Sequence, residues 1–361
     1  LVIFMDYFLE HRTYGYFYFV TGFAFLFLLP KLIFCAFHLL DDVTHLVRLA
    51  ASWTERSSES EPHEKITRVQ FLSQLGAGAA FITFGSMFYG MTRGKFAFRV
   101  IEQKVPIAGL PDAFEGARVV HISDMHIGSF LDNYEEVRRA VQMINDLKAD
   151  YVFFTGDMVN NYAHELDSWI DIIAEIKASR GKFSIFGNHD YGDYVQWPDE
   201  QSKRENLQTL VRYHEQMGFR LLRNEHVELR HGDDSITLVG IENWGSGFAK
   251  YGDLEKAMRG VDPSAVKVLL SHDPTHWEKQ VLGQKPVQLT LSGHTHGMQF
   301  GVEIPILNVK ISPARMRYKR WGGLYTEGDQ HLYVNRGFGF LGFPGRVGIW
   351  PEITLLQLTK G

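Results

Sequence analysis

The sequence predicts an α/β domain with a largely parallel core, preceded by two hydrophobic helices, and three observations support this prediction. From about Val100, short β-rich runs alternate with helical stretches in a β-α-β-α-β order, which favours right-handed parallel connections. Before that point lie two long apolar segments. Several β-rich runs end in groups of Asp, Asn, His and Gly residues. The length of 361 residues is sufficient for a large catalytic domain and an additional segment.

The first apolar segment covers residues 14–40 and is about long enough to cross the ~30 Å hydrocarbon core of a bilayer as a helix. Pro30 and Lys31 interrupt this segment. Two alternatives follow, because the helix either spans only Tyr14 through Leu29 or continues as a longer helix with a kink at the proline.

The second apolar segment, residues 71–91, has no charged side chain, and its small residues suit close helix packing in lipid. We therefore expect residues 1–99 to form a membrane anchor with a polar connecting loop, and residues 100–361 to form the catalytic domain. The alternative is a pair of buried helices in a soluble protein. Because the chain starts at Leu1 rather than at methionine, we expect a fragment or a processed form.

The flanks of the two segments carry similar numbers of Lys and Arg residues, so the positive-inside rule leaves the orientation open. The run that begins at Arg68 (RVQFL), followed by Gly and Ala, is similar to a decayed twin-arginine export signal. It slightly favours an extracytoplasmic catalytic domain in a bacterial cell membrane.

The elements of the catalytic domain follow from apolar periodicity. Residues 135–147 and 167–176 have the spacing of helices. The predicted strands are 119–123, 151–155, 183–186, 236–241, 266–271, 287–292, 331–335 and 353–358.

Composition excludes several classes of protein. The chain is 45% hydrophobic and 22% charged, which excludes a disordered or fibrous protein. Its net charge of -5 provides no basic field for nucleic acid, and we expect no nucleic-acid partner. Cys35 is the only cysteine, so neither an intramolecular disulfide nor a zinc site built from several thiolates can form.

Five polar clusters follow predicted strands, and we expect them to meet at one rim because ligands bind beyond the carboxyl ends of parallel strands. The clusters are Asp124-Met125-His126, Gly156-Asp157, Gly187-Asn188-His189-Asp190, Ser271-His272-Asp273 and Gly293-His294-Thr295-His296-Gly297. Their candidate ligands are two Asp, one Asn and four His, a mixture of oxygen and imidazole that suits Mn, Fe or Zn. Seven ligands exceed the need of one ion and suit two divalent ions that share a carboxylate.

In this order, the blocks D-x-H, G-D, G-N-H-D, a lone His after a strand and G-H-T-H resemble those of the calcineurin-like metallophosphoesterases. The resemblance covers roughly residues 116–358. The runs HISDMHIG, LLSHDP and LSGHTHGMQ are most similar to the membrane-associated or exported bacterial phosphodiesterase branch. The resemblance implies a four-layer α/β/β/α sandwich with two mixed sheets.

The resemblance also implies roles for individual residues. The ligands of the first metal would be Asp124, His126 and His296, those of the second Asn188, His272 and His294, with Asp157 as the bridge. His189 would act at the leaving-group oxygen as a general acid or an electrostatic stabiliser, and Asp190 would orient it.

These observations predict a membrane-anchored phosphoesterase with two metal ions, which cleaves a phosphodiester or diphosphate by attack of a metal-bridging hydroxide. The basic and apolar stretch 303–320 is a candidate site for anionic lipid headgroups or a diphosphate, so a lipid-linked substrate is one alternative. Arg336 is a further candidate phosphate contact. A phosphomonoesterase or protein phosphatase is the second alternative, and a non-catalytic membrane sensor is the third. The oligomeric state stays open.

Overall fold

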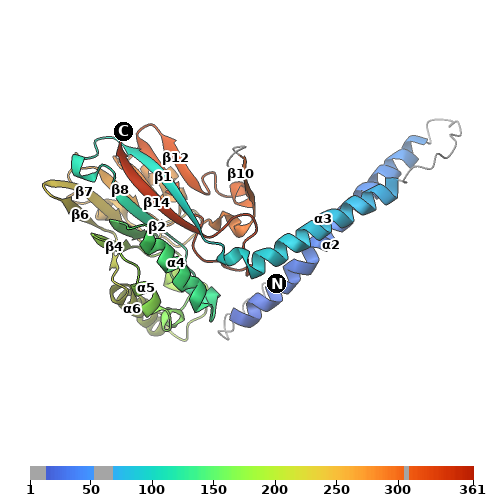
Figure 1. Ribbon diagram of the computed structural model, residues 1–361, viewed down its shortest axis with the longest axis horizontal. Helices are drawn as coiled ribbons and strands as arrows, with labels where there is room; N and C mark the ends of the chain where they lie inside the picture. The colour runs from blue at the N-terminus through green and yellow to red at the C-terminus, as the bar shows by residue number, and fades with distance from the viewer. Residues whose placement is uncertain (1–13, 53–67, 305–308) are drawn as a thin grey trace.

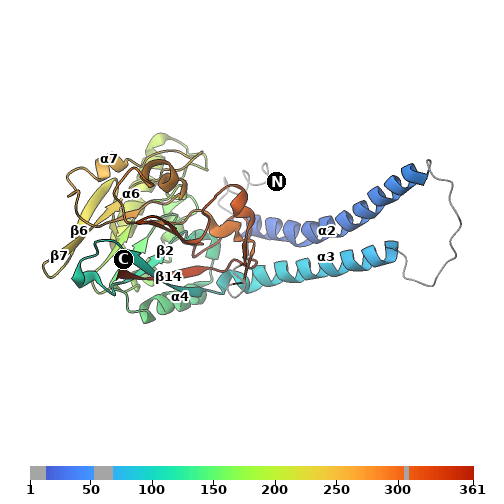
Figure 2. The same cartoon turned by 90° about the horizontal axis from the view of Figure 1, so that it is seen from above.

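The computed structural model describes residues 14–52, 68–304 and 309–361. These residues form an α/β domain from which two long helices project as a hairpin (Figure 1). The hairpin consists of α2 (Tyr14–Ser52) and α3 (Arg68–Thr92), which run side by side away from the domain (Figure 2). Helix α2 continues through Pro30, which is the longer of the two alternatives for the first segment.

Large apolar side chains cover the outside of both helices. Phe19 is 70% exposed and Phe81 is 77% exposed, so these are not the buried helices of a soluble core. Both helices are long and apolar enough to cross a membrane. At Gly76 an added Cβ would lie 3.0 Å from the Cβ of Phe37, which explains why small residues are needed where α3 packs on α2.

The first sheet of the domain has the strand order β1-β14-β2-β3-β4-β5. Strands β2 to β5 are parallel, whereas β14 is antiparallel to β2 and parallel to β1. The strands are β1 (Arg99–Ile107), β2 (Arg118–Ile122), β3 (Tyr151–Phe154), β4 (Gly181–Ser184), β5 (Arg220–Leu221) and β14 (Glu352–Lys360).

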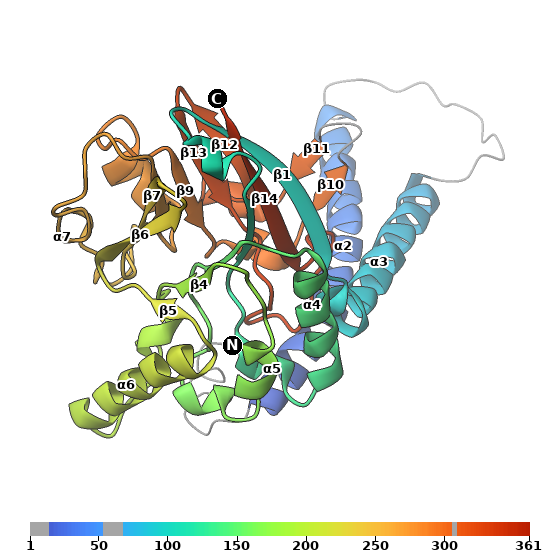
Figure 3. The same ribbon diagram turned by 60° about the vertical axis from the view of Figure 1, so that its left-hand side comes forward.

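The second sheet has the strand order β12-β13-β9-β8-β7-β6, with a parallel centre and antiparallel pairs at both edges. Its strands are β6 (Glu225–His231), β7 (Asp234–Gly240), β8 (Lys267–Leu270), β9 (Leu289–Ser292), β12 (Gly323–Glu327) and β13 (Gln330–Val334). A separate antiparallel pair, β10 (Val302–Ile304) and β11 (Val309–Ile311), lies beside the start of the helical hairpin (Figure 3).

The side chains of the strands divide the core into layers. Val119 of β2 and Leu270 of β8 belong to one apolar cluster between the two sheets. The next residue of β2, Val120, faces the helices α4 (Tyr134–Asp146), α5 (Ile170–Ala174) and α6 (Glu200–Gln216). Leu269 of β8 faces the opposite outer layer, which includes α7 (Leu254–Ala257). This period-two alternation produces the α/β/β/α sandwich with two mixed sheets, as predicted.

Candidate metal centre

The five polar clusters lie at the carboxyl ends of central strands in both sheets. Asp124 follows β2, Asp157 follows β3 and Asn188 follows β4, which are neighbours in the first sheet. His272 follows β8 and His294 follows β9 in the second sheet. Because the parallel strands of both sheets end at the same rim, residues that are up to 172 positions apart come together, as the sequence predicted.

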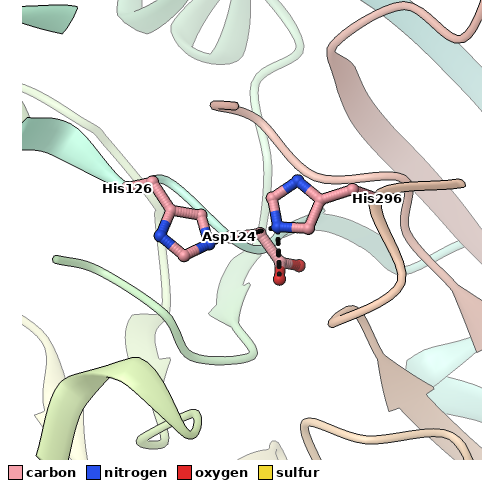
Figure 4. Close-up of side chains that lie close together, drawn as sticks. All are labelled: Asp124, His126 and His296. Atoms are coloured by element: carbon pink, nitrogen blue, oxygen red, sulfur yellow. Dashed lines mark hydrogen bonds and ion pairs between the residues drawn. The ribbon is translucent and has the colours of Figure 1, made fainter. Parts of the chain in front are cut away.

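The first group of ligands consists of Asp124, His126 and His296, whose side chains converge (Figure 4). His126 Nε2 lies 3.1 Å from His296 Nε2. His296 Nε2 lies 3.3 Å from the Asp124 carboxylate. This group could hold one metal ion, and all three side chains are buried.

The second group consists of Asp157, His272 and His294. His272 Nε2 lies 3.1 Å from Asp157 Oδ2 and 3.2 Å from His294 Nδ1. Asp157 Oδ2 also lies 3.6 Å from His126 Nε2 of the first group. Asp157 therefore stands between the two groups, where a carboxylate can serve two ions.

The chemistry of the donors fits cations. In each group two imidazole nitrogens and a carboxylate oxygen face one another. These atoms are mostly hydrogen-bond acceptors, so a cation between them would satisfy their lone pairs. Asn188 donates from Nδ2 to the Tyr194 hydroxyl at 2.8 Å, and its buried Oδ1 has no hydrogen-bond partner among the described residues. Asn188 stands in the chain between Gly187 and His189, which both lie against Asp157, and an unpartnered buried carbonyl there is the expected state of a ligand oxygen.

The charge of the site also favours cations. Burial opposes a charged imidazole, yet the carboxylates of Asp157 and Asp124 raise the pKa of His272 to about 10. Burial likewise opposes the charged carboxylates, but the neighbouring histidines hold the pKa of Asp124 and of Asp157 below the usual range. The two carboxylates therefore stay ionised and attract positive charge.

The backbone at five of the seven predicted ligands is left-handed, a conformation that non-glycine residues rarely adopt. The positive φ angles are 52° at Asp124, 44° at His126, 59° at Asp157, 70° at His294 and 49° at His296. Such strain collects at functional sites and is maintained by the surrounding fold. Here it turns these five side chains toward the rim within four residues of the strand ends.

His189 lies beside the first group, with its ring centroid 5.0 Å from that of His126. Its Nδ1 donates to the carbonyl of Asn160 at 2.8 Å, and its backbone N–H donates to Asp157 Oδ1 at 2.8 Å. The Asp190 carboxylate instead accepts backbone N–H groups of Asp157, Met158 and Gly187, each at 2.8 Å. The expectation that Asp190 orients the His189 ring is therefore wrong, because the carbonyl of Asn160 holds it.

Two family models match the chain. The description "Calcineurin-like phosphoesterase" matches residues 117–298, about half of the chain, and "Probable Calcineurin-like phosphoesterase, transmembrane domain" matches residues 1–95. A Bacillus subtilis protein named "Uncharacterized metallophosphoesterase YkuE" is 30% identical over 302 residues, covering 82% of this chain and 98% of the relative. This chain belongs to the calcineurin-like phosphoesterases. It also carries the transmembrane domain of such a protein.

The relatives of this phosphoesterase also include animal proteins. A Danio rerio protein named "Transmembrane protein with metallophosphoesterase domain" is 31% identical over 281 residues, covering 75% of this chain and 60% of the relative. The chain thus matches less than two thirds of that relative's length. Among solved structures, the NAD nucleotidase of Haemophilus influenzae is a distant likeness, with a TM-score of 0.40 and 14% identity. That match covers 62% of this chain and 45% of the nucleotidase.

The structure of this phosphoesterase adds contacts that the sequence analysis missed. Thr155 accepts a hydrogen bond on its carbonyl from His272 Nδ1 at 2.7 Å, which leaves Nε2 free to bind a metal. The Tyr318 hydroxyl lies 2.9 Å from His294 Nε2. The spacing of the Asp and His residues in the sequence does not predict either contact, because Thr155 and Tyr318 lie far in the sequence from the histidines that they contact.

Arg336 does not face the centre as a free phosphate contact. Its guanidinium pairs with Glu303 at 2.7 Å and with Glu352. Glu352 is fully buried in the core of the fold. These two ion pairs make Arg336 a structural residue, which corrects the expectation from its place after a strand.

Proposed function

We propose that this phosphoesterase is a membrane-anchored phosphodiesterase that uses two divalent ions, Mn, Fe or Zn. The observation that carries the proposal is the position of Asp157 between two facing groups of ligands, 3.1 Å from His272 and 3.6 Å from His126. When bound, two such ions lower the pKa of water and neutralise phosphoryl oxygens. In this proposal residues 1–99 are the anchor and residues 100–361 the catalytic domain.

Each side chain has a stated role in the proposal. Asp157 is shared between the ions. The other ligands are Asp124, His126 and His296 for one ion, and Asn188, His272 and His294 for the other. His189, held by the carbonyl of Asn160, assists the departing oxygen. Asp190 holds the Asp157 loop through backbone N–H groups and so supports the ligands.

A cationic cavity supports a lipid-linked substrate. The cavity has a volume of about 560 Å³. Two of its lining residues, Arg317 and Lys319, flank Tyr318 in the sequence, and the Tyr318 hydroxyl lies 2.9 Å from His294 Nε2. The cations that line it are Lys310, Arg315, Arg317 and Lys319, and no acidic side chain lines it. The Arg317 guanidinium stands 5.3 Å from the ring of Phe248, which itself contacts the ring of His294.

Exposed apolar side chains belong to the segments that line the same cavity, since Met316 is a lining residue and Ile311 follows the lining residue Lys310 in the chain. Met316 is 86% exposed and Ile311 is 63% exposed. The pair β10–β11 lies next to the projecting helices (Figure 3), so this pair is on the side of the domain from which the hairpin leaves. Cations beside exposed apolar groups suit an anionic amphiphile at a membrane surface. The extracytoplasmic placement in a bacterial membrane stays a prediction from the signal-like run at Arg68.

We expect Asp157→Asn to lose more than about 100-fold in metal-dependent turnover of bis-p-nitrophenyl phosphate, because the shared ligand is removed. The full chain in detergent is assayed with Mn²⁺, Fe²⁺, Zn²⁺ or chelator, and p-nitrophenyl phosphate serves as the monoester. Asp171→Asn, at an exposed acid, is the matched control. Turnover of the monoester alone would favour the phosphatase alternative. Two bound ions without turnover of either ester would favour the sensor.

The double variant Arg315→Gln, Arg317→Gln tests the cationic cavity. Dioctanoyl phosphatidic acid should inhibit diester hydrolysis by the unmodified chain, whereas dioctanoylglycerol should not. The variant should weaken this inhibition about fivefold or more at unchanged kcat, because two partly solvated charge contacts are lost. The double variant Arg220→Gln, Arg259→Gln, at exposed arginines elsewhere, is the control. Equal inhibition of both variants would contradict the lipid-anion role.

A further inference from the structure

The first two turns of α2 are seated inside the catalytic domain. Tyr14 and Tyr18 are only 8% and 6% exposed, although the same helix presents Phe19 and Phe23 to its surroundings. Figures 1 and 3 show this end of α2 beside the loops that follow the first sheet, next to α4 and α5. The rings are held by packing, since Tyr18 meets Phe340 of the domain edge-on at 5.8 Å.

A chain of hydrogen bonds connects the Tyr18 hydroxyl to His189 through two residues, Ser129 and Asn160. It lies 2.5 Å from Ser129 Oγ, which donates to Asn160 Oδ1 at 3.2 Å. The backbone carbonyl of the same Asn160 accepts the hydrogen bond of His189 Nδ1 at 2.8 Å. Ser129 and Asn160 are buried, so water does not compete for these bonds.

The Tyr14 hydroxyl reaches the same loop by a second route. It donates to Glu165 Oε1 at 3.0 Å and accepts from Asn161 Nδ2 at 3.3 Å. The Glu165 carboxylate accepts the backbone N–H groups of Asn160, Asn161 and Tyr162 at 2.8 to 2.9 Å. Glu165 therefore fixes the peptide units on both sides of the carbonyl that holds His189.

We propose that Tyr14 and Tyr18 of the transmembrane helix are positioning residues for His189, so that docking of α2 sets the direction of the catalytic imidazole. This inference rests on the proposed role of His189 at the leaving group. It makes the helix hairpin a part of the active site rather than only an anchor. A shift of α2 in the membrane would then change the rate of the reaction without touching the metal ligands.

The variants Tyr18→Phe and Tyr14→Phe test the inference, because they remove one hydroxyl and keep the ring that packs. The full chain with Mn²⁺ hydrolyses two diesters, methyl p-nitrophenyl phosphate and methyl phenyl phosphate, which has the poorer leaving group. His189→Gln defines the full effect of losing the acid. We expect each variant to lower kcat for the phenyl ester about tenfold relative to the p-nitrophenyl ester, at unchanged KM and metal content.

Tyr89→Phe, at a half-exposed ring of α3 that packs on Trp350, is the matched control and should leave the ratio unchanged. The ring nitrogen resonances of His189, assigned by their loss in His189→Gln, provide a readout apart from activity. They should shift in Tyr18→Phe. An unchanged ratio together with unchanged resonances would overturn the inference. If His189→Gln itself leaves the ratio unchanged, the proposed acid role fails, and the resonances alone decide whether α2 positions the ring.

Discussion

At the scale of single residues, the candidate metal centre depends on a backbone conformation that most residues avoid. Asp124 and Asp157 both have positive φ, and each lies within three residues of the end of a strand. Two glycines make room for them. An added Cβ at Gly187 would overlap Asp157 Oδ1, and one at Gly293 would overlap Asp124 Oδ2. The glycines of the G-N-H-D and G-H-T-H blocks are therefore required by the carboxylates opposite them.

We expect Gly187→Ala to weaken metal affinity by about 10- to 100-fold, because the methyl group displaces the Asp157 carboxylate that lies between the two groups of ligands. Metal content after dialysis against buffers of fixed free Mn²⁺ measures this affinity. Gly85→Ala is the control, since its Cβ would meet no atom within 4 Å. Full metal content in Gly187→Ala would contradict this prediction, because it would show that the Asp157 carboxylate can shift without a loss of metal affinity.

At the scale of elements, the sequence predicted the central strands of the sheets but not the edge strand β1 of the first sheet. The strands β2 and β3 are short, largely apolar runs that precede polar clusters, so their pattern is local, and the predicted strand 183–186 overlaps the second half of β4 (Gly181–Ser184). The edge strand β1 was missed because its partner is β14, about 250 residues later. Helix α6 was also missed, although Asp199 caps it by accepting from the Ser202 N–H at 2.7 Å. Only Leu210 and His214 of this polar helix are buried, so its apolar stripe is narrow.

The contact of α6 with β4 predicts an acid-sensitive stability. Burial lowers the pKa of His214 to about 3, and its ring meets Ser184, Phe154, Phe186 and Phe219, none of which carries charge. The unfolded chain takes up a proton near pH 6.5, whereas the folded chain does not until about pH 3. Stability from this residue is therefore complete above pH 6.5 and is lost as the pH falls toward 3.

Between these pH values we expect the free energy of unfolding to change by about 1.4 kcal/mol per pH unit, because the unfolded chain binds one more proton than the folded chain. His214→Asn should remove this part of the slope, measured by denaturant titration of the chelator-treated chain at several pH values. Phe219→Leu is the control, because it loosens the same packing without removing a titrating group. An identical slope in His214→Asn and the unmodified chain would show that another group takes up the proton.

At the scale of the whole molecule, the hairpin is longer than a membrane is thick. The 39 residues of α2 extend roughly 58 Å as a helix, whereas the hydrocarbon core is about 30 Å thick. Part of the additional length lies within the domain, where Tyr14 and Tyr18 of the first two turns are buried. Gly90 of α3 also lies against the backbone of Arg346, where an added Cβ would stand 2.7 Å from its carbonyl oxygen. Both helices therefore contact the domain. Arg346, whose backbone N–H donates to the Gly90 carbonyl, also lies 3.3 Å from His296 of the candidate metal centre.

The sequence by itself determined the fold class, the two apolar segments and the polar clusters from which the candidate ligands come. Each of these features depends on residues that are close together in the sequence, because a strand and the polar cluster that follows it are only a few residues long. The tertiary structure alone decided how Arg336 is paired, which group holds His189 and that Tyr14 meets Glu165, 151 residues away. Such contacts depend on how segments that are distant in the sequence pack together. The sequence around a hydrogen-bonding side chain in a helix or loop does not predict which distant residue will be its partner.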